Sequence, residues 1–129
     1  MSSPTLDAHF RRLKERYADA VLTPLPSGAG LITLPKRPLP AAWSPATVAL
    51  HFIAPVGYPV AAPDSFWLEP NVTVNGSVPK NSTTNHSIPE TGITGHYFSW
   101  HLEANRWSPN NHDLLTFVGV CLKRLECLE

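Results

Sequence analysis

A possible nucleophile and a possible base lie two residues apart in the segment 95–109. The pair is Ser99 and His101, with an aromatic residue between them. In an extended segment, Tyr97, Ser99 and His101 lie on one face and the intervening residues on the other. A serine hydroxyl is a competent nucleophile near neutral pH only when a base takes its proton, and the ordinary histidine pKa of about 6.5 suits that base. The spacing therefore makes Ser99 and His101 a candidate nucleophile and base, although a Ser-x-His motif alone is a weak signal.

Acidic residues further along the chain extend this prediction. Asp113 is the preferred carboxylate to orient the imidazole of His101, as in a Ser-His-Asp arrangement, and Glu103 is the second choice. The same three residues, Ser99, His101 and Asp113, would also suit a serine peptidase, but no oxyanion-hole signature is legible. A catalytic zinc site is a third alternative, built from His86, His96, His101, His112 and Asp113. Because no two of these side chains have a specific zinc-site spacing, we expect neither a metal nor a cofactor.

The composition limits the classes of partner. The 129 residues have room for one domain, 1–129, and ten basic residues balance ten acidic ones. A pI near 7.0 excludes the strong positive charge of a nucleic-acid or membrane-surface binder, so the expected partner is a protein. The first residues have no signal-peptide pattern, and no apolar stretch approaches the roughly 18 residues of a membrane span. We therefore expect a cytoplasmic protein.

The cysteines and the asparagines are interpreted as structural. Cys121 and Cys127 lie six residues apart in one predicted helix, where their side chains diverge, so we expect two reduced thiols with Cys121 in the core. Four Asn-x-Ser/Thr sequences occur within seventeen residues, at Asn71, Asn75, Asn81 and Asn85. They are formal glycosylation acceptors, but Asn, Ser, Thr and Gly also accumulate in any long solvated loop, and we favour that interpretation.

The pattern of apolar residues predicts an α+β fold. An N-terminal helix, an antiparallel meander of about four strands and a final helix should pack together. The predicted helices are 4–20 and 113–128, and the clearest predicted strands are 30–34, 47–53 and 65–68. A polar stretch with Gly and Pro, residues 71–95, separates the last of these strands from Ser99, and we interpret it as a flap beside the site.

Two motifs resemble the ubiquitin-conjugating enzyme (UBC) superfamily, and this resemblance covers nearly the whole chain. The first motif contains Tyr58-Pro59, Ala62-Pro63 and Phe66, with Ala62 in place of a proline. The second is Trp107-Ser108-Pro109. More narrowly, Gly57-Tyr58-Pro59, Asp64-Ser65-Phe66-Trp67 and Ser99-x-His101 resemble the prokaryotic UBC-like family E. The resemblance implies a UBC-like fold that lacks the last two helices of typical members.

The resemblance also implies a function for Ser99. The family's catalytic cysteine lies eight residues before the Trp of Trp-Ser-Pro, and here that position is Ser99. The implied protein is a bacterial carrier, associated with antiphage defence, that accepts a ubiquitin-like protein from an adenylating enzyme as an oxyester and transfers it to a target. The first helix and the flap would bind these partners. The family's His-Pro-Asn motif is absent, so the alternative is an inactive variant that serves as a binding module.

Overall fold

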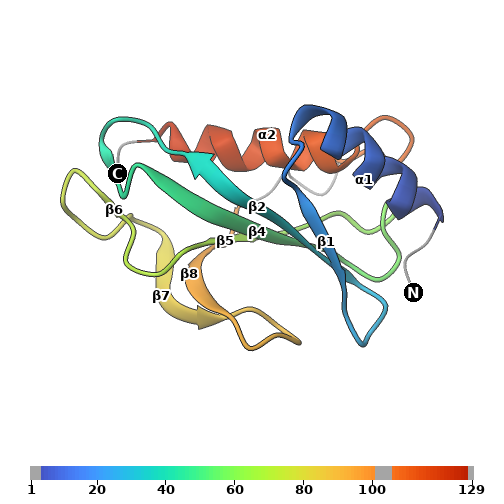
Figure 1. Cartoon of the computed structure of the whole chain (residues 1–129), viewed down its shortest axis with the longest axis horizontal. Coiled ribbons are helices and arrows are strands. Elements are labelled where there is room, and N and C mark those ends of the chain that lie inside the picture. Colours follow the sequence, from blue (N-terminus) through green and yellow to red (C-terminus); the bar gives the residue numbers. More distant parts are fainter. Residues whose placement is uncertain (1–3, 101–105, 128–129) are drawn as a thin grey trace.

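The computed structural model describes residues 4–100 and 106–127, and these form one α+β unit. Two helices lie on the same side of a twisted antiparallel sheet (Figure 1). The helices are α1 (Pro4–Arg16) and α2 (Leu114–Leu125). The six-stranded sheet has the order β1 (Val21–Pro24), β2 (Gly30–Pro38), β4 (Thr47–Ala54), β5 (Phe66–Leu68), β8 (Thr94–Phe98) and β7 (Ser82–Ser87). Two short strands, β3 (Trp43–Ser44) and β6 (Thr73–Val74), pair separately.

Both helices end earlier than the sequence predicted. The last bond of α1 is made by Tyr17, whose amide donates to the carbonyl of Leu13, and the chain then turns into β1. β1 pairs with β2, which removes residues 17–20 from the helix. The helix α2 ends at Leu125, so Cys127 is exposed and lies outside it. Within the described residues, no helix is long and apolar enough to cross a membrane.

The sheet has six strands where about four were predicted. The main error concerns segment 71–95, which contains β6, β7 and the start of β8 and is not a structureless flap. β7 has the sequence Ser-Thr-Thr-Asn-His-Ser and is largely exposed, because it is an edge strand held by its backbone pairing with β8. A strand of this kind has no alternating apolar pattern, so the sequence gives little sign of it.

The asparagines of segment 71–95 have a backbone role. Asn71, Asn75, Asn81 and Asn85 have positive φ angles of 71°, 50°, 56° and 51°. Asparagine tolerates this left-handed conformation better than most residues, and all four side chains are exposed. Asn71, Asn75 and Asn81 lie in turns, whereas Asn85 lies within β7, where the pairing with β8 is irregular, so the interpretation as one long solvated loop is corrected.

The two faces of the sheet are covered differently. On the helix side, Phe66 stacks on Phe98 with ring centroids 4.8 Å apart, within a core that also contains Phe52 and Phe117. On the outer side, a smaller cluster contains Trp67, with Tyr97 packed against it. The predicted alternation of Tyr97 and Phe98 between the two faces is confirmed.

Candidate functional site

Ser99 follows directly after β8 and is exposed to solvent. In the pairing of β5 with β8, Phe66 lies opposite Phe98 and Trp67 opposite Tyr97. His101 and Glu103 lie in residues 101–105, outside the described residues.

A buried arginine supports the Ser99 segment from the helix side. Arg124, in the last turn of α2, is only 4% exposed. The central carbon of its guanidinium lies 5.2 Å from the ring centroid of Phe98 and 5.9 Å from that of Trp100, so Arg124 contacts the residues on both sides of Ser99. Its Nη2 donates to the carbonyl of Lys80 at 2.7 Å, whereas its buried Nη1 has no partner among the described residues. Sequence reasoning missed this residue, which belongs to an otherwise apolar helix face.

His96 lies close to Arg124 in the same layer. Its Nε2 is 2.6 Å from the hydroxyl of Ser82, and its side chain is buried. Burial, with a smaller contribution from the charge of Arg124, lowers the pKa of His96 below its ordinary value. Burial therefore favours the neutral form of His96.

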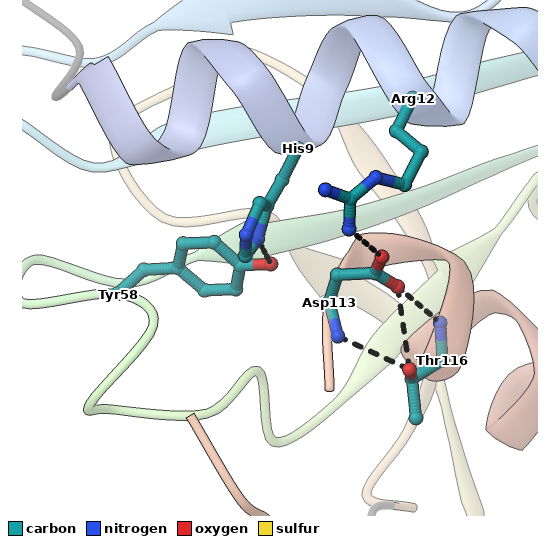
Figure 2. Close-up of polar contacts among 5 residues, drawn as sticks. All are labelled: His9, Arg12, Tyr58, Asp113 and Thr116. Atoms are coloured by element: carbon teal, nitrogen blue, oxygen red, sulfur yellow. Dashed lines mark hydrogen bonds and ion pairs between the residues drawn. The ribbon is translucent and has the colours of Figure 1, made fainter. Parts of the chain in front are cut away.

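Asp113 caps the start of α2. Its Oδ1 accepts hydrogen bonds from the backbone amide and the hydroxyl of Thr116, and its Oδ2 accepts one from Arg12 of α1 at 2.8 Å (Figure 2). Burial alone would raise the pKa of Asp113, but the hydrogen bonds from Arg12 and Thr116 outweigh it and hold that pKa below its ordinary value. Both carboxylate oxygens are therefore engaged in holding α1 to α2.

The described contacts separate Asp113 from Ser99. Arg124 contacts the two residues that flank Ser99, and it lies eleven residues after Asp113. A helix rises 1.5 Å per residue, so the two ends of α2 are roughly 16 Å apart along its axis. No contact between Asp113 and Ser99 is present among the described residues, and His101, which would join them, lies outside these residues, so the triad stays a prediction. The sequence prediction relied on the short separation of Asp113 and His101 along the chain.

Next to Asp113, the two motifs that carried the family resemblance contact each other. The Trp107 Nε1 donates to the carbonyl of Pro59 at 2.7 Å. The hydroxyl of Tyr58 lies 2.7 Å from Nδ1 of His9 on α1 (Figure 2). Burial lowers the pKa of His9 and, with the charge of Asp113, raises the pKa of Tyr58. These motif residues therefore join α1, the turn after β4 and the start of α2.

Of the histidines considered for zinc, the described ones are His86, His96 and His112, and each has a hydrogen-bond partner of its own. His86 Nδ1 accepts from Trp67 Nε1 at 3.0 Å, and His112 Nδ1 accepts from the backbone amide of Ser108 at 3.0 Å. Among residues 4–100 and 106–127, no group of three or more metal-ligating side chains is close enough to hold an ion. His51, on β4, is hydrogen-bonded to the hydroxyl of Thr33 at 2.9 Å.

A cavity of about 360 Å³ opens on the outer face of the sheet. Its lining includes Ile53, Asp64, Ser65, Trp67, His86 and Tyr97. Sequence reasoning did not predict it. The available signal was that Trp67 and Tyr97 alternate out of phase with the core residues Phe66 and Phe98, so two large aromatic rings had to lie on the other face.

Comparison with known proteins gives one match. A family model described as prokaryotic E2 family E matches residues 9–127, in agreement with the resemblance noted in the sequence. The match includes both motifs and Ser99. No curated protein and no solved structure matches the chain.

Proposed function

Because the chain belongs to prokaryotic E2 family E, a family of ubiquitin-like conjugation carriers, we propose that it carries a ubiquitin-like protein as an ester on Ser99. The observation that carries this proposal is the place of Ser99. It is exposed at the end of β8, eight residues before Trp107, where the family pattern has its nucleophile. Trp107 itself is held by the Pro59 carbonyl, which anchors that motif.

The proposed chemistry is an acyl transfer. The hydroxyl oxygen of Ser99 attacks the activated C-terminal carbonyl of the ubiquitin-like protein, the bond to the donor breaks, and the proton of Ser99 goes to His101 as general base. We assign Asp113 a structural role as the N-cap of α2, because its carboxylate is bonded to Arg12 and Thr116. Arg124 packs against the rings of Phe98 and Trp100 on the helix side of the Ser99 segment.

The proposed partners are a ubiquitin-like protein, an adenylating enzyme that activates it, and a target protein. Helix α1 offers a basic exposed surface for the adenylating enzyme, with Arg11, Lys14 and Arg16 directed to solvent. Segment 71–95 lies beside the Ser99 end of the sheet, since β7 pairs with β8. We assign this side to the ubiquitin-like protein.

A binding-only variant is the second candidate. It is favoured by the bonding of both carboxylate oxygens of Asp113 to Arg12 and Thr116, and by the absence of the family's His-Pro-Asn motif. In this case the fold would bind the same partners without forming an ester.

The test is a reconstituted reaction with the ubiquitin-like protein, the adenylating enzyme and ATP. An adduct on Ser99 should survive thiols and be cleaved by hydroxylamine or mild alkali, and mass spectrometry should map it to Ser99. It should disappear in Ser99→Ala and persist in the matched control Ser44→Ala, which changes an exposed serine on β3. It should also persist when Cys121 and Cys127 are both replaced by alanine.

The reaction also separates the two candidates. An adduct that persists in Ser99→Ala would refute the assignment of Ser99. Binding of both partners with no adduct, in a cascade whose adenylating enzyme is active, would favour the binding-only variant. Loss of the adduct in a folded His101→Ala protein would support the role of His101 as the general base.

A further inference from the structure

Arg124 is a buried cation on the helix side of the Ser99 segment. It is 4% exposed and belongs to the last turn of α2. The central carbon of its guanidinium lies 5.2 Å from the ring centroid of Phe98 and 5.9 Å from that of Trp100, and these are the residues on either side of Ser99. Because consecutive Cα atoms are about 3.8 Å apart, the charge lies on the order of 10 Å from the hydroxyl of Ser99.

The charge of Arg124 has no counter-charge among the described residues. Nη2 donates to a neutral acceptor, the backbone carbonyl of Lys80, at 2.7 Å, and Nη1 is buried without a partner in the described part of the chain. A guanidinium stays protonated in proteins, so burial does not remove the charge. A buried polar atom without a partner is unfavourable, and a well-packed apolar side chain at such a position is often no less stable. Packing alone therefore does not account for an arginine at this position.

The surroundings of Arg124 screen its charge weakly. Phe98, whose ring the guanidinium contacts, is fully buried. Charges interact several times more strongly in such an apolar layer than in water. His96 of the same layer reports this effect, because burial and, to a smaller extent, the charge of Arg124 lower its pKa. Lys123 and Glu126, the other charged residues at this end of α2, are exposed and screened by solvent. The positive charge available to this layer is therefore that of Arg124.

We propose that Arg124 stabilises the negative charge that develops at Ser99 during acyl transfer. This proposal rests on the proposed function and adds a charge-stabilising residue to it. Arg124 acts through space from the helix side, so it neither contacts the acyl group nor exchanges a proton. A fixed charge of this kind favours the transition state, because it is in place before the reaction begins and does not have to reorganise.

The step that Arg124 assists is balanced by the reactants already named. The Oγ of Ser99 forms a bond to the C-terminal carbonyl carbon of the ubiquitin-like protein, and the π electrons of that carbonyl move to its oxygen. The proton of Ser99 goes to the general base. The oxyanion then collapses, the bond to the donor breaks, and the donor group leaves with that electron pair. Negative charge is greatest around the oxyanion, and this is the state that a nearby cation stabilises most.

A thiol at position 99 measures the effect of Arg124 without any ester chemistry. In the Ser99→Cys protein, the thiolate is a negative charge at the position of the attacking oxygen, and a nearby cation favours it over the thiol. Iodoacetamide alkylates the thiolate, so the pH profile of the alkylation rate has a midpoint that reports charge and a limiting rate at high pH that reports accessibility. Cys127 is exposed and is replaced by serine in every protein, whereas Cys121 is buried. Peptide mass mapping confirms the position of the adduct.

Arg124→Met should move the midpoint to higher pH and leave the limiting rate unchanged. At an effective dielectric constant of about 20–40, a unit charge on the order of 10 Å away changes the thiolate population by roughly four- to fifteenfold, and alkylation at pH 7 should slow by that factor. Arg124→Lys keeps the charge and should stay within about twofold of the parent rate. The matched control, Lys123→Met, removes an exposed charge from the neighbouring residue of α2 and should leave the midpoint unchanged.

The variants also separate an electrostatic role from a structural one. Urea denaturation first checks that each variant is folded. Arg124→Gln, which keeps a donor for the carbonyl of Lys80, takes the place of Arg124→Met if the latter does not fold. An unchanged midpoint in a folded neutral variant would overturn the proposal. A loss confined to the limiting rate would also overturn it, because that result leaves Arg124 with a purely structural role.

The reconstituted reaction tests the same charge on the natural nucleophile. Arg124→Met should lower kcat for ester formation on Ser99 by roughly four- to fifteenfold with KM within about twofold, and Arg124→Lys should restore kcat. Equal kcat in wild type and Arg124→Met would overturn the proposal. If the wild-type protein forms no ester, the proposed function fails, whereas the thiol measurement still decides whether Arg124 acts on a negative charge at position 99.

Discussion

Replacement of Asp113 separates a structural role from a catalytic one. Asp113→Ala removes the N-cap acceptor of α2 and the partner of Arg12. Loss of an N-cap costs about 1 kcal/mol, and the Arg12 pair adds at most a few tenths because the Arg12 side chain is 58% exposed. The free energy of unfolding should therefore fall by roughly 1–2 kcal/mol. Asp113→Asn keeps a capping oxygen and should lose less than about 1 kcal/mol. Urea denaturation at pH 7 measures both changes.

The pH dependence of this effect has a defined sign. Hydrogen bonds to Arg12 and Thr116 hold the pKa of Asp113 below its unfolded value of about 3.9. The carboxylate therefore binds fewer protons in the folded protein, and its contribution to stability is present above pH 4 and is lost as the pH falls through the folded pKa. The difference in stability between wild type and Asp113→Asn should shrink over that range.

Ester formation gives the decisive comparison for Asp113. In a Ser-His-Asp triad, an Asp-to-Asn change lowers the rate by about 10⁴. Here Asp113 lies roughly 16 Å along α2 from the end that contacts the Ser99 segment. Asp113→Asn should therefore form the ester within about threefold of the wild-type rate, or roughly 0.6 kcal/mol of activation free energy. A thousandfold loss in a folded Asp113→Asn protein would refute this reasoning and return Asp113 to the triad.

Three further predictions concern titration, packing and the arginine. Burial lowers the pKa of three histidines: His9, His51 and His96. Each of these histidines binds fewer protons in the folded chain than in the unfolded chain. The free energy of unfolding should therefore fall as the pH is lowered from 7.5 through the unfolded pKa of about 6.5. Urea titrations that show the opposite slope would contradict this. Gly95→Ala should lower the free energy of unfolding by about 1–3 kcal/mol, because a Cβ there would lie 2.7 Å from the carbonyl oxygen of Leu68. In the control Gly92→Ala the new Cβ meets nothing within 4 Å, so its effect on stability should be near zero. Thermal melts compare the two variants. Arg124→Met should change the free energy of unfolding by no more than about 1 kcal/mol, since a buried cation is replaced by an apolar side chain. The same change should shift the NMR signal of the Trp100 indole, because Arg124 contacts that ring. The control Lys123→Met should leave this signal unchanged.

Much of the fold could be predicted because its main elements have periodic apolar patterns. Helix α2 and strand β4 each present a regular apolar face to one core, so their existence and type follow from spacing. Strand β7 could not be predicted in this way, because it is stabilised by backbone bonds to β8 and its side chains are polar. The end of α1 was also missed, since it depends on β1 joining the sheet.

The candidate site was also predictable only in part. The place of Ser99 on an exposed strand end follows from local alternation and from the family motif. The position of Asp113 does not, because α2 separates it from the Ser99 segment, and sequence spacing contains no information on that path. Arg124 and the cavity were equally hidden, since each depends on residues from distant segments meeting in three dimensions.

The ion pair between Arg12 and Asp113 has a consequence for biosynthesis. These residues are 101 positions apart, and this contact helps to hold α1 to α2. During synthesis α1 emerges first but cannot complete this contact until α2 has left the ribosome. The intervening hairpins of the sheet have shorter loops to close and can form earlier. Docking of α1 onto α2 is therefore expected to follow formation of the sheet, and a nascent chain stalled before residue 113 should leave part of α1 open to protease.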